Sequence, residues 1–412
     1  NSKKKATISF ERKCLAMLAN PATIDSSQFD NFIASRTEPN WITEQRLQAW
    51  KAFEQAEQPF WRRTNLKGFN LNDYRVADAD VTIDFAGADG VTVLPLAEAL
   101  RFHGDAVQKV FGSAVRTDRD KYAALNNAYV NAGVFIHVAK NIECDTPIHI
   151  TYRVKNAGDL IVPRTLIYAE PNSAIRVIEE IVSDEFTGKA LILSGTEIEA
   201  HDNANVHYTS IQTLHENVTM FGNQQMNLVG KDAHGDWLNI VLGGAVQHVT
   251  LEANMSGNGS SVTWNGLLYA NGEQNLLVAP TLHHAGLNTE GQIHFKTVVD
   301  DQGYAVFDGM VKIPATGQGT NSDLREHALH LSSNARSDSI PGLEIDANEV
   351  KAGHGSTSSQ IDAEQLFYLQ SRGLPFEEAK RTIVIGFVGE IIDMIDDETI
   401  RERVEEIVAD KV

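Results

Sequence analysis

The residue with the clearest capacity for chemistry is a histidine between two glycines, in the segment Gly353-His354-Gly355. Glycine has no side chain to obstruct the backbone path, so the sequence predicts that the imidazole of His354 is presented to its surroundings rather than packed. An imidazole binds iron and other transition metals, and it can also relay a proton. We therefore take His354 as the candidate metal-ligating residue, with an ordinary structural polar residue as the alternative.

Five further histidines fall within 48 residues of one another, namely His283, His284, His294, His327 and His330. A fold built of repeated strands could bring some of them onto one face, where imidazoles bind metals. Histidine is also common on exposed strands and turns. Because neither a nearby cysteine nor a clear carboxylate partner accompanies this group, the sequence assigns no metal to it.

Cysteine is scarce, with Cys14 and Cys144 the only two in 412 residues. Two thiols exclude a disulfide scaffold, and they exclude an all-cysteine metal or cluster site within one subunit. The isolated chain is therefore expected to hold no such cluster stably by its own thiols. A reducing, cytoplasmic compartment is expected, and no secretory signal pattern follows the lysines at positions 3–5.

Several classes of function are excluded by what the sequence lacks. It contains no G-x-x-x-x-G-K-[ST] phosphate loop, no H-E-x-x-H zinc motif, no G-x-S-x-G nucleophile motif and no dinucleotide fingerprint after a strand. The formal net charge of -20 argues against a binder of nucleic acid or anionic membrane, which needs a basic face. No apolar run reaches the roughly 18 to 20 residues of a membrane span. We expect a soluble protein without an active site.

The elements that must position His354 change in character along the chain. Residues 1–131 are expected to form a mostly helical region, with helices over about 44–60 and 96–111. Residues 132–360 consist of short alternating stretches separated by Asn, Asp and Gly, which is typical of strands. Residues 361–412 are expected to form a C-terminal helical domain.

The first helix of that C-terminal domain is expected to begin after an N-cap at Asp362 and to end at Gly373. In the next helix, four apolar residues recur at a spacing of four and predict a buried face: Ile383, Phe387, Ile391 and Ile395. A further amphipathic helix follows, and the two are expected to pair as a hairpin.

Five large apolar residues recur through the strand region: Ile178, Tyr208, Trp237, Trp264 and Phe295. Their spacings of 30, 29, 27 and 31 positions drift without tandem identity. Such a period is typical of the coils of a parallel β-helix, in which inward residues stack on those of the previous coil and Asn and Gly make the corners. The sequence therefore predicts a mainly β fold with a right-handed parallel β-helix core, and a β-sandwich is the alternative.

The residues around His354 resemble the SufB/SufD family of iron–sulfur cluster assembly proteins, and most of all its SufD members. The shared motif comprises Leu343-Glu344-Ile345, Val350-Lys351, His354-Gly355, Thr357 and Leu366 to Gly373. An upstream segment, Trp61-Arg62-Arg63-Thr64, is similar to the W-R-x-T motif of the family. Ala352 stands where many relatives have cysteine and Ser356 replaces an alanine, so a thiol at position 352 is not available to this protein.

The resemblance implies a β-helix with helical ends that serves as a scaffold subunit and not as an enzyme. It implies pairing with a SufB-like subunit through the β-helix and engagement of a SufC-type ATPase through the C-terminal helices, and it leaves open a homodimer when the chain is alone. It makes His354 a candidate ligand of iron or of a transient iron–sulfur cluster at the subunit interface, with thiolates from the partner.

Two readings from other classes remain open. A β-helix carbohydrate-active enzyme would need paired carboxylates on neighbouring coils, and Glu252, Asp300 and Asp301 are the acidic residues to place. A stand-alone structural protein would lack an ATPase partner.

Overall fold

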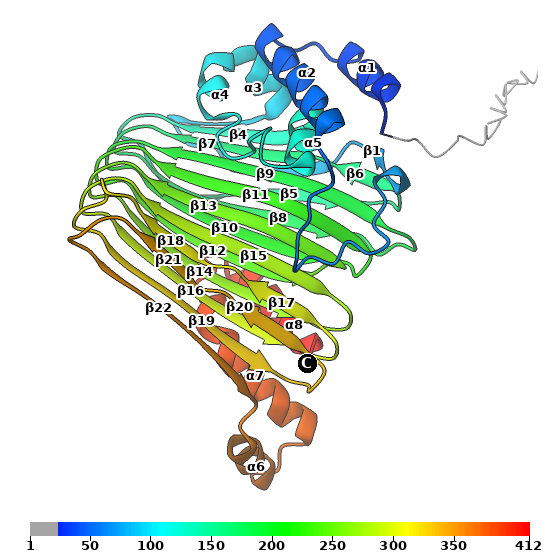
Figure 1. Ribbon diagram of the computed structural model, residues 1–412, viewed down its shortest axis with the longest axis vertical. Helices are drawn as coiled ribbons and strands as arrows, with labels where there is room; N and C mark the ends of the chain where they lie inside the picture. The colour runs from blue at the N-terminus through cyan, green and yellow to red at the C-terminus, as the bar shows by residue number, and fades with distance from the viewer. Residues whose placement is uncertain (1–23) are drawn as a thin grey trace, which may run out of the picture.

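The core of the protein is a parallel β-helix of about eight turns, in which the chain alternates between two facing sheets (Figure 1). The computed structural model describes residues 24–412, so Cys14 and the lysines at positions 3–5 lie outside the described residues. Sheet A contains 13 strands and sheet B contains nine. Because consecutive strands pass between the sheets and neighbours within a sheet are parallel, the predicted β-helix is confirmed and the β-sandwich is not formed.

Sheet A contains β1 (Arg75–Val76), β3 (Val91–Pro95), β4 (Ala132–Val138), β6 (Asp159–Ile161), β7 (Pro163–Ala169), β9 (Ala190–Ala200), β11 (Val218–Leu228), β13 (Val246–Met255), β15 (Asn275–His284), β17 (Tyr304–Phe307), β18 (Met310–Ile313), β20 (Arg336–Ser339) and β21 (Gly342–Ile345). Sheet B contains, in spatial order, β2 (Asp80–Asp84), β5 (Glu143–Val154), β8 (Ala174–Ser183), β10 (Asn205–Leu214), β12 (His234–Gly243), β14 (Ser261–Ala270), β16 (Glu290–Val299), β19 (Asn321–His330) and β22 (Lys351–Gln360). The antiparallel pairs are β2 with β5 and β3 with β4, at the N-terminal end of the stack.

One corner of the coils is made by a series of residues with left-handed backbone conformation. These residues are Asn141, Asn172, Asn203, Asp232, Gly259, Asn288 and Gly319, with φ between 54° and 77° and 27 to 31 positions between neighbours. Asparagine, aspartate and glycine tolerate this conformation better than other residues do. The side chains also join successive coils, since Asn172 Nδ2 donates to Asn141 Oδ1 at 2.8 Å and Asn203 Nδ2 donates to Asn172 Oδ1 at 3.1 Å. The corners therefore set the coil length.

Three of the five repeat residues occupy equivalent places inside the β-helix, as predicted. Tyr208, Trp237 and Trp264 are register partners on β10, β12 and β14, and all three are buried. The indole rings of Trp237 and Trp264 are stacked, with centroids 4.3 Å apart and an interplanar angle of 5°. A column of aromatic rings thus fills the middle coils.

The other two repeat residues are buried but do not belong to that column. Phe295 faces inward two positions further along its strand, because Ile293 is the register partner of Trp264. Ile178 is one position away from Val177, the partner of Tyr208, so it points to the opposite face. It packs in the cluster beneath the C-terminal helices, and its predicted inward place was wrong.

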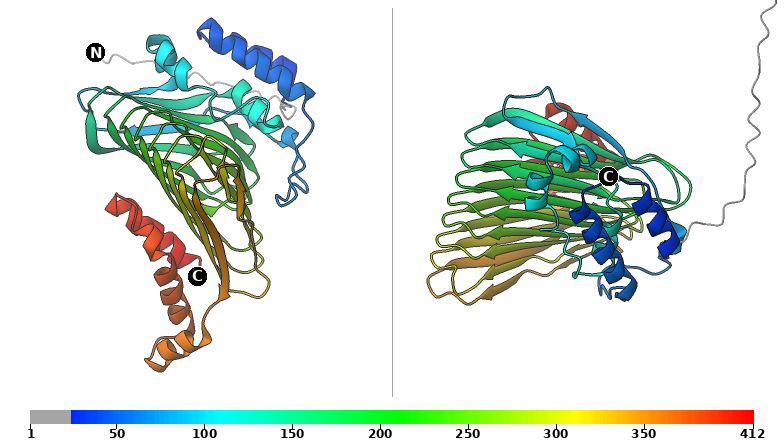
Figure 2. Two further views of the ribbon diagram at one scale, coloured as in Figure 1. Left: turned by 60° about the vertical axis from the view of Figure 1, so that its left-hand side comes forward. Right: turned by 90° about the horizontal axis from the view of Figure 1, so that it is seen from above.

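The N-terminal helices cover the outer face of sheet A at the first coils (Figure 2). They are α1 (Ser26–Ala34), α2 (Asn40–Gln55), α3 (Leu96–Phe102), α4 (Gly104–Val110) and α5 (Lys121–Tyr129), with a short 3-10 turn over Leu71–Asp73. In α2, Trp50 and Phe53 are buried as the helical spacing predicts, whereas Leu47 is 49% exposed. The helix expected over 96–111 forms as α3 and α4, which meet at His103.

The C-terminal helices α7 (Phe376–Ile392) and α8 (Glu398–Asp410) lie on the outer face of sheet B (Figures 1 and 2). Of the four residues predicted to form a buried face, Ile391 and Ile395 are fully buried and Ile383 and Phe387 are half-buried. Earlier in α7 the fully buried positions are Val384 and Val388, one residue further along the helix. These side chains pack on outward apolar residues of sheet B such as Ile240. The two helices are therefore attached along the β-helix, and their removal would uncover an apolar surface.

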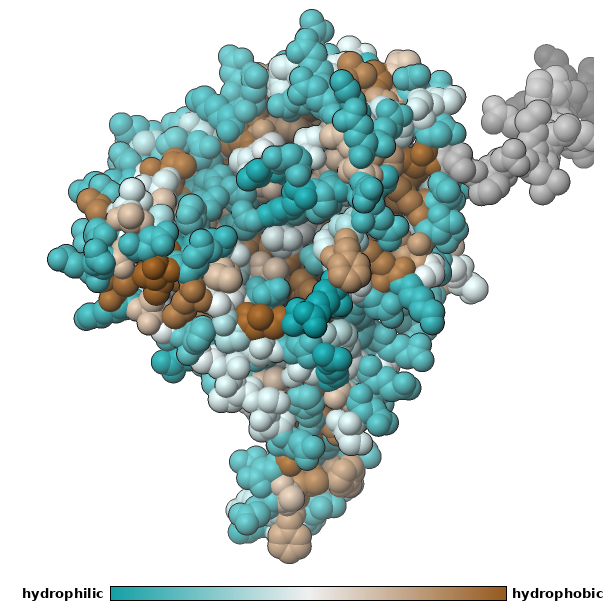
Figure 3. Space-filling model, in the orientation of Figure 1, coloured by the Kyte–Doolittle hydropathy of each residue, from teal (hydrophilic) through white to brown (hydrophobic). Residues whose placement is uncertain are grey.

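Helix α6 (Ala363–Ser371) protrudes beyond the last coil (Figure 1). Asp362 caps it by accepting a hydrogen bond from the backbone N–H of Glu364 at 2.8 Å, and Gly373 follows its end with φ of 97°. Both predicted ends are confirmed. None of its residues is buried, and apolar side chains are visible on the protruding tip (Figure 3).

Candidate functional site

His354 lies on β22, the last strand of sheet B, and its side chain is exposed. Its register partner is Leu324 on β19, which is fully buried inside the β-helix. His354 therefore belongs to the inward-facing row of side chains, but no further coil follows to cover it. The predicted presentation of the imidazole is confirmed, and its cause is the open end of the stack.

The two flanking glycines do not produce this exposure. Neither Gly353 nor Gly355 has a left-handed backbone conformation. A Cβ atom at Gly355 would meet nothing within 4 Å, and one at Gly353 would meet only Asp323 Oδ1 at 3.5 Å. The prediction that side chains would obstruct this backbone was wrong, because the segment is an extended strand at an edge.

No thiol lies close to His354 within residues 24–412. Cys144 is buried on β5, which lies near the opposite end of sheet B from β22, and burial raises the pKa of its thiol. Ala352 occupies an inward position two residues before His354 and packs against the core. Among the described residues, none supplies a thiolate at this end of the β-helix.

The five clustered histidines separate into different environments. His284 is fully buried between Thr289 Oγ1 at 2.9 Å and Ser322 Oγ at 3.0 Å, and burial lowers its pKa to about 4. His330 is within hydrogen-bonding distance of Ser337 Oγ at 2.9 Å. Over the described part of the chain, no group of three His, Cys, Asp or Glu side chains is placed to hold a metal ion.

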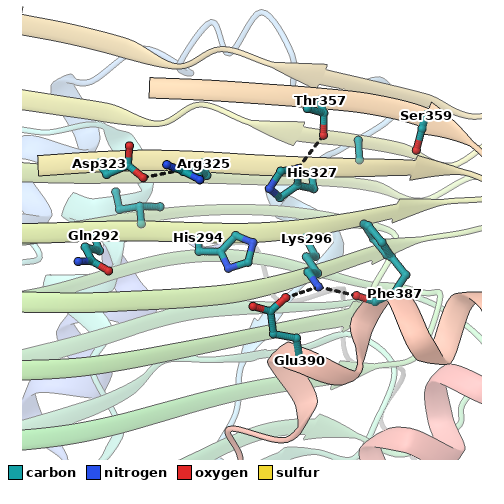
Figure 4. A pocket seen from close by; sticks show the side chains of 12 residues that line it. Gln292, His294, Lys296, Asp323, Arg325, His327, Thr357, Ser359, Phe387 and Glu390 are labelled. Carbon is teal, nitrogen blue, oxygen red and sulfur yellow. Dashed lines mark hydrogen bonds and ion pairs between the residues drawn. The ribbon is translucent and has the colours of Figure 1, made fainter. Parts of the chain in front are cut away.

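His294 and His327 come together in a cavity of about 700 Å³ between sheet B and α7 (Figure 4). Their rings are perpendicular with centroids 5.4 Å apart, and His327 Nδ1 lies 2.6 Å from Thr357 Oγ1. Lys296 Nζ donates to Glu390 Oε2 at 2.6 Å and to the Phe387 carbonyl oxygen at 2.7 Å. The polar groups of this cavity thus join the coils to α7.

That cavity and His354 lie on opposite faces of the last strands. Thr357 is at an odd position of β22 and points outward, whereas His354 shares the inward alternation with Ala352. The two sites are therefore separate, and the cavity adds no ligand to His354.

The acidic residues considered for a carbohydrate-active enzyme are engaged elsewhere. Asp300 accepts a hydrogen bond from Lys380 Nζ at 2.8 Å, and Glu252 forms an ion pair with Arg119. Asp301 is at a coil corner with φ of 52°, where Gly272 N donates to its carboxylate at 3.1 Å. These partners give the three carboxylates structural roles, with Glu252 on β13 and both aspartates in the turn after β16.

The family model of the SUF system FeS cluster assembly SufBD core domain matches residues 152–387, and the model of the SufBD protein N-terminal region matches residues 69–150. The iron-sulfur cluster assembly protein SufD of Bacillus subtilis is 26% identical, over 96% of this chain and 99% of its own length. Iron-sulfur cluster assembly SufBD family proteins of Staphylococcus aureus are 29% to 30% identical. The aligned part is 70% of this chain and 62% of their length. Within residues 24–412, no helix is long and apolar enough to cross a membrane. The matched core domain covers most of the coils and ends within α7. The chain therefore belongs to the SufBD family of iron–sulfur cluster assembly proteins, within which it is most like SufD.

Proposed function

We propose that this chain is a SufD-like scaffold subunit that pairs with a SufB-like subunit, engages a SufC-type ATPase and catalyses no reaction itself. The observation that carries the proposal is the exposed edge strand β22, which bears His354 at the open end of the β-helix. No strand of residues 24–412 pairs with the outer edge of β22, so its ten residues offer N–H and C=O groups to a strand of a second chain. A second copy of this chain could pair at the same edge when the SufB-like subunit is absent.

An iron–sulfur cluster would then be a transient cargo of the paired subunits. His354 supplies an imidazole ligand at the junction, and the partner supplies thiolates, because Cys144, the cysteine within residues 24–412, is remote. The isolated chain binds no cluster stably under this proposal.

The C-terminal helices offer the ATPase its binding surface. Two aromatic side chains on α6, Phe367 and Tyr368, are exposed, as is Phe376 at the start of α7. A groove of about 900 Å³ lies between α6, α7 and the end of β22. Since α7 and α8 are packed on sheet B, a force applied at these helices would reach the coils directly. Use of ATP by the partner is consistent with a cytoplasmic location.

Replacing Phe367 with aspartate is expected to weaken ATPase binding by about 2 kcal/mol, the cost of losing an aromatic anchor of an interface. The side chain is 73% exposed, so the fold should not change. Phe102→Asp is the matched control, because Phe102 is 70% exposed on α3 at the other end of the molecule. Equal affinity of the Phe367→Asp variant and the wild type, measured by calorimetry with the purified ATPase, would contradict this binding surface.

Replacing His354 with alanine should cost on the order of 1 kcal/mol of stability or less, since the side chain is exposed. The variant should still assemble with both partners and yet mature fewer clusters after anaerobic reconstitution. A cysteine at this position should restore part of the yield, because thiolate also binds iron.

Absorbance measures the cluster content of each variant, and the melting temperature is determined on the same samples. Arg325→Ala is a suitable control, because Arg325 is exposed on the outer face of the neighbouring strand. A normal cluster yield in His354→Ala would show that His354 has only a structural role. If the variant failed to assemble with its partners, a low cluster yield would result from the lost interface and not from a lost ligand.

A further inference from the structure

A cavity of about 270 Å³ lies where the N-terminal helices meet the first coil of the β-helix. It is remote from His354, because β2, which lines it, and β22 are at opposite ends of sheet B. Val81 and Ile83 line the cavity from β2 and pack against the interior core. Leu96 and Leu100 line it from α3 and belong to the cluster under the N-terminal helices. The cavity therefore separates two hydrophobic clusters.

Smaller apolar residues, among them Ala97, Ala132 and Gly133, complete the walls of this cavity. Open space beside buried apolar side chains lowers stability, because those side chains lose the contacts that a close-packed interior provides. Cavities with such walls bind apolar molecules of matching size. The lining therefore fits the hydrocarbon part of a small ligand.

One ion pair at the cavity is already complete. Arg46 is 1% exposed and donates from Nε and Nη2 to the two carboxylate oxygens of Glu38, at 2.8 Å and 2.9 Å. Its Nη1 atom donates to the carbonyl oxygen of Ala128 at 3.0 Å. The charges of Arg46 and Glu38 cancel, and the guanidinium of Arg46 has no further need of a partner.

Arg36 is the cation that this ion pair leaves over. Its Nη1 atom lies 3.6 Å from Glu38 Oε1, too far for a good hydrogen bond, and its buried Nε atom has no hydrogen-bond partner among residues 24–412. The guanidinium lies over the ring of Phe32, 4.1 Å from the centroid, which holds it in place. One positive charge therefore remains unmatched at the cavity.

Asp78 is the other carboxylate of the lining, and it does not neutralise Arg36. Over the described part of the chain, Asp78 forms an ion pair with neither Arg36 nor Arg46. It is exposed, so water screens its charge. The charges at the cavity therefore favour an anionic ligand over a cationic one.

We propose that this cavity binds a small aliphatic monocarboxylate. The carboxylate of the ligand pairs with Arg36, because a planar guanidinium donates two parallel hydrogen bonds to such a group. The hydrocarbon chain of the ligand covers the apolar side chains of β2 and α3 and joins the two hydrophobic clusters. This site is independent of the proposed function, since its lining includes no residue of β22 or of the C-terminal helices.

The first test titrates butanoate, hexanoate and octanoate into the full chain and follows binding by calorimetry. Affinity should rise about fourfold for each added methylene, as expected for hydrocarbon that leaves water, until the chain fills the cavity. Octanol is the neutral comparison, because it has the same chain length without the charge. Octanoate should bind at least about tenfold more tightly than octanol, which is the contribution of a hydrogen bond to a charged group.

The second test replaces Arg36 with methionine, which removes the charge and keeps an unbranched side chain over Phe32. The Arg36→Met variant should bind octanoate at least about tenfold more weakly than the wild type and octanol equally well. Arg101→Met is the matched control, because Arg101 is exposed on α3 outside the cavity and also lies over a phenylalanine ring, that of Phe102, at 5.4 Å. It should bind octanoate as the wild type does.

Four results would each overturn the proposal: no octanoate binding by the wild type, equal affinity for octanoate and octanol, wild-type octanoate affinity in Arg36→Met, or equal weakening in Arg101→Met. Melting temperatures without ligand identify a loss of binding that results from unfolding. A crystal structure of the full chain with octanoate is independent of any variant. Ligand density between β2 and α3 supports the site, and density only elsewhere, such as in the groove between α6 and α7, rejects it.

Discussion

Replacing Glu197 with alanine is expected to lower the free energy of unfolding by about 3 to 5 kcal/mol. Glu197 forms an ion pair with Arg164, and the side chains of both are 0% exposed. Its other oxygen accepts hydrogen bonds from Ser113 Oγ and from the backbone N–H of Ala114, both at 3.0 Å. The alanine variant would leave a buried guanidinium without its charged partner, which is the costly outcome for a buried ion pair.

The effect should appear in the N-terminal helical layer first. Arg164 also donates to Asn126 at 2.6 Å and to Asn127 at 3.0 Å, both on α5, so the network attaches that helix to the coils. Denaturant unfolding measures the change, and hydrogen exchange reports whether α5 opens. Glu199→Ala is the control, because Glu199 lies on the same strand and face and pairs with His201 at a partly exposed position. A change below about 1 kcal/mol, as for a surface pair, would show that the network is not stabilising α5.

Replacing Trp237 with alanine should also destabilise the protein by about 3 to 5 kcal/mol, because it deletes a buried indole and leaves a cavity. Trp237 is stacked on Trp264 and lies edge-on to Tyr208, with centroids 4.3 Å and 6.0 Å away. The strands on both sides are paired with β12 over its length, so the spacing of the sheet opposes closure of the space.

Trp237→Phe is the conservative control for this prediction. It keeps an aromatic ring in the column and removes the indole N–H, which has no partner within residues 24–412. The phenylalanine variant should therefore lose less than half of the stability that the alanine variant loses. Thermal and urea unfolding measure both variants, and similar melting temperatures for the alanine variant and the wild type would reject the stacked column as a source of stability.

The sequence by itself determined the architecture. Coil length depends on local corner residues, so the 27- to 31-residue period and the Asn and Gly positions favour a β-helix over a β-sandwich. The cap at Asp362 is equally local, because its hydrogen bond reaches only two residues along the chain. The family followed from motifs that are contiguous around His354.

Only the tertiary structure decided which face each side chain occupies. A shift of one residue turned Ile178 from the expected interior to the surface beneath the C-terminal helices, and spacing alone does not fix such a register. His354 is exposed because the stack of coils ends at β22. Leu324, the register partner of His354, is buried because that same strand lies beside it, which is a consequence of pairing between strands 30 residues apart in the chain. Burial and access at the candidate site therefore depend on which coil is last, a property of the assembled β-helix that no local segment contains.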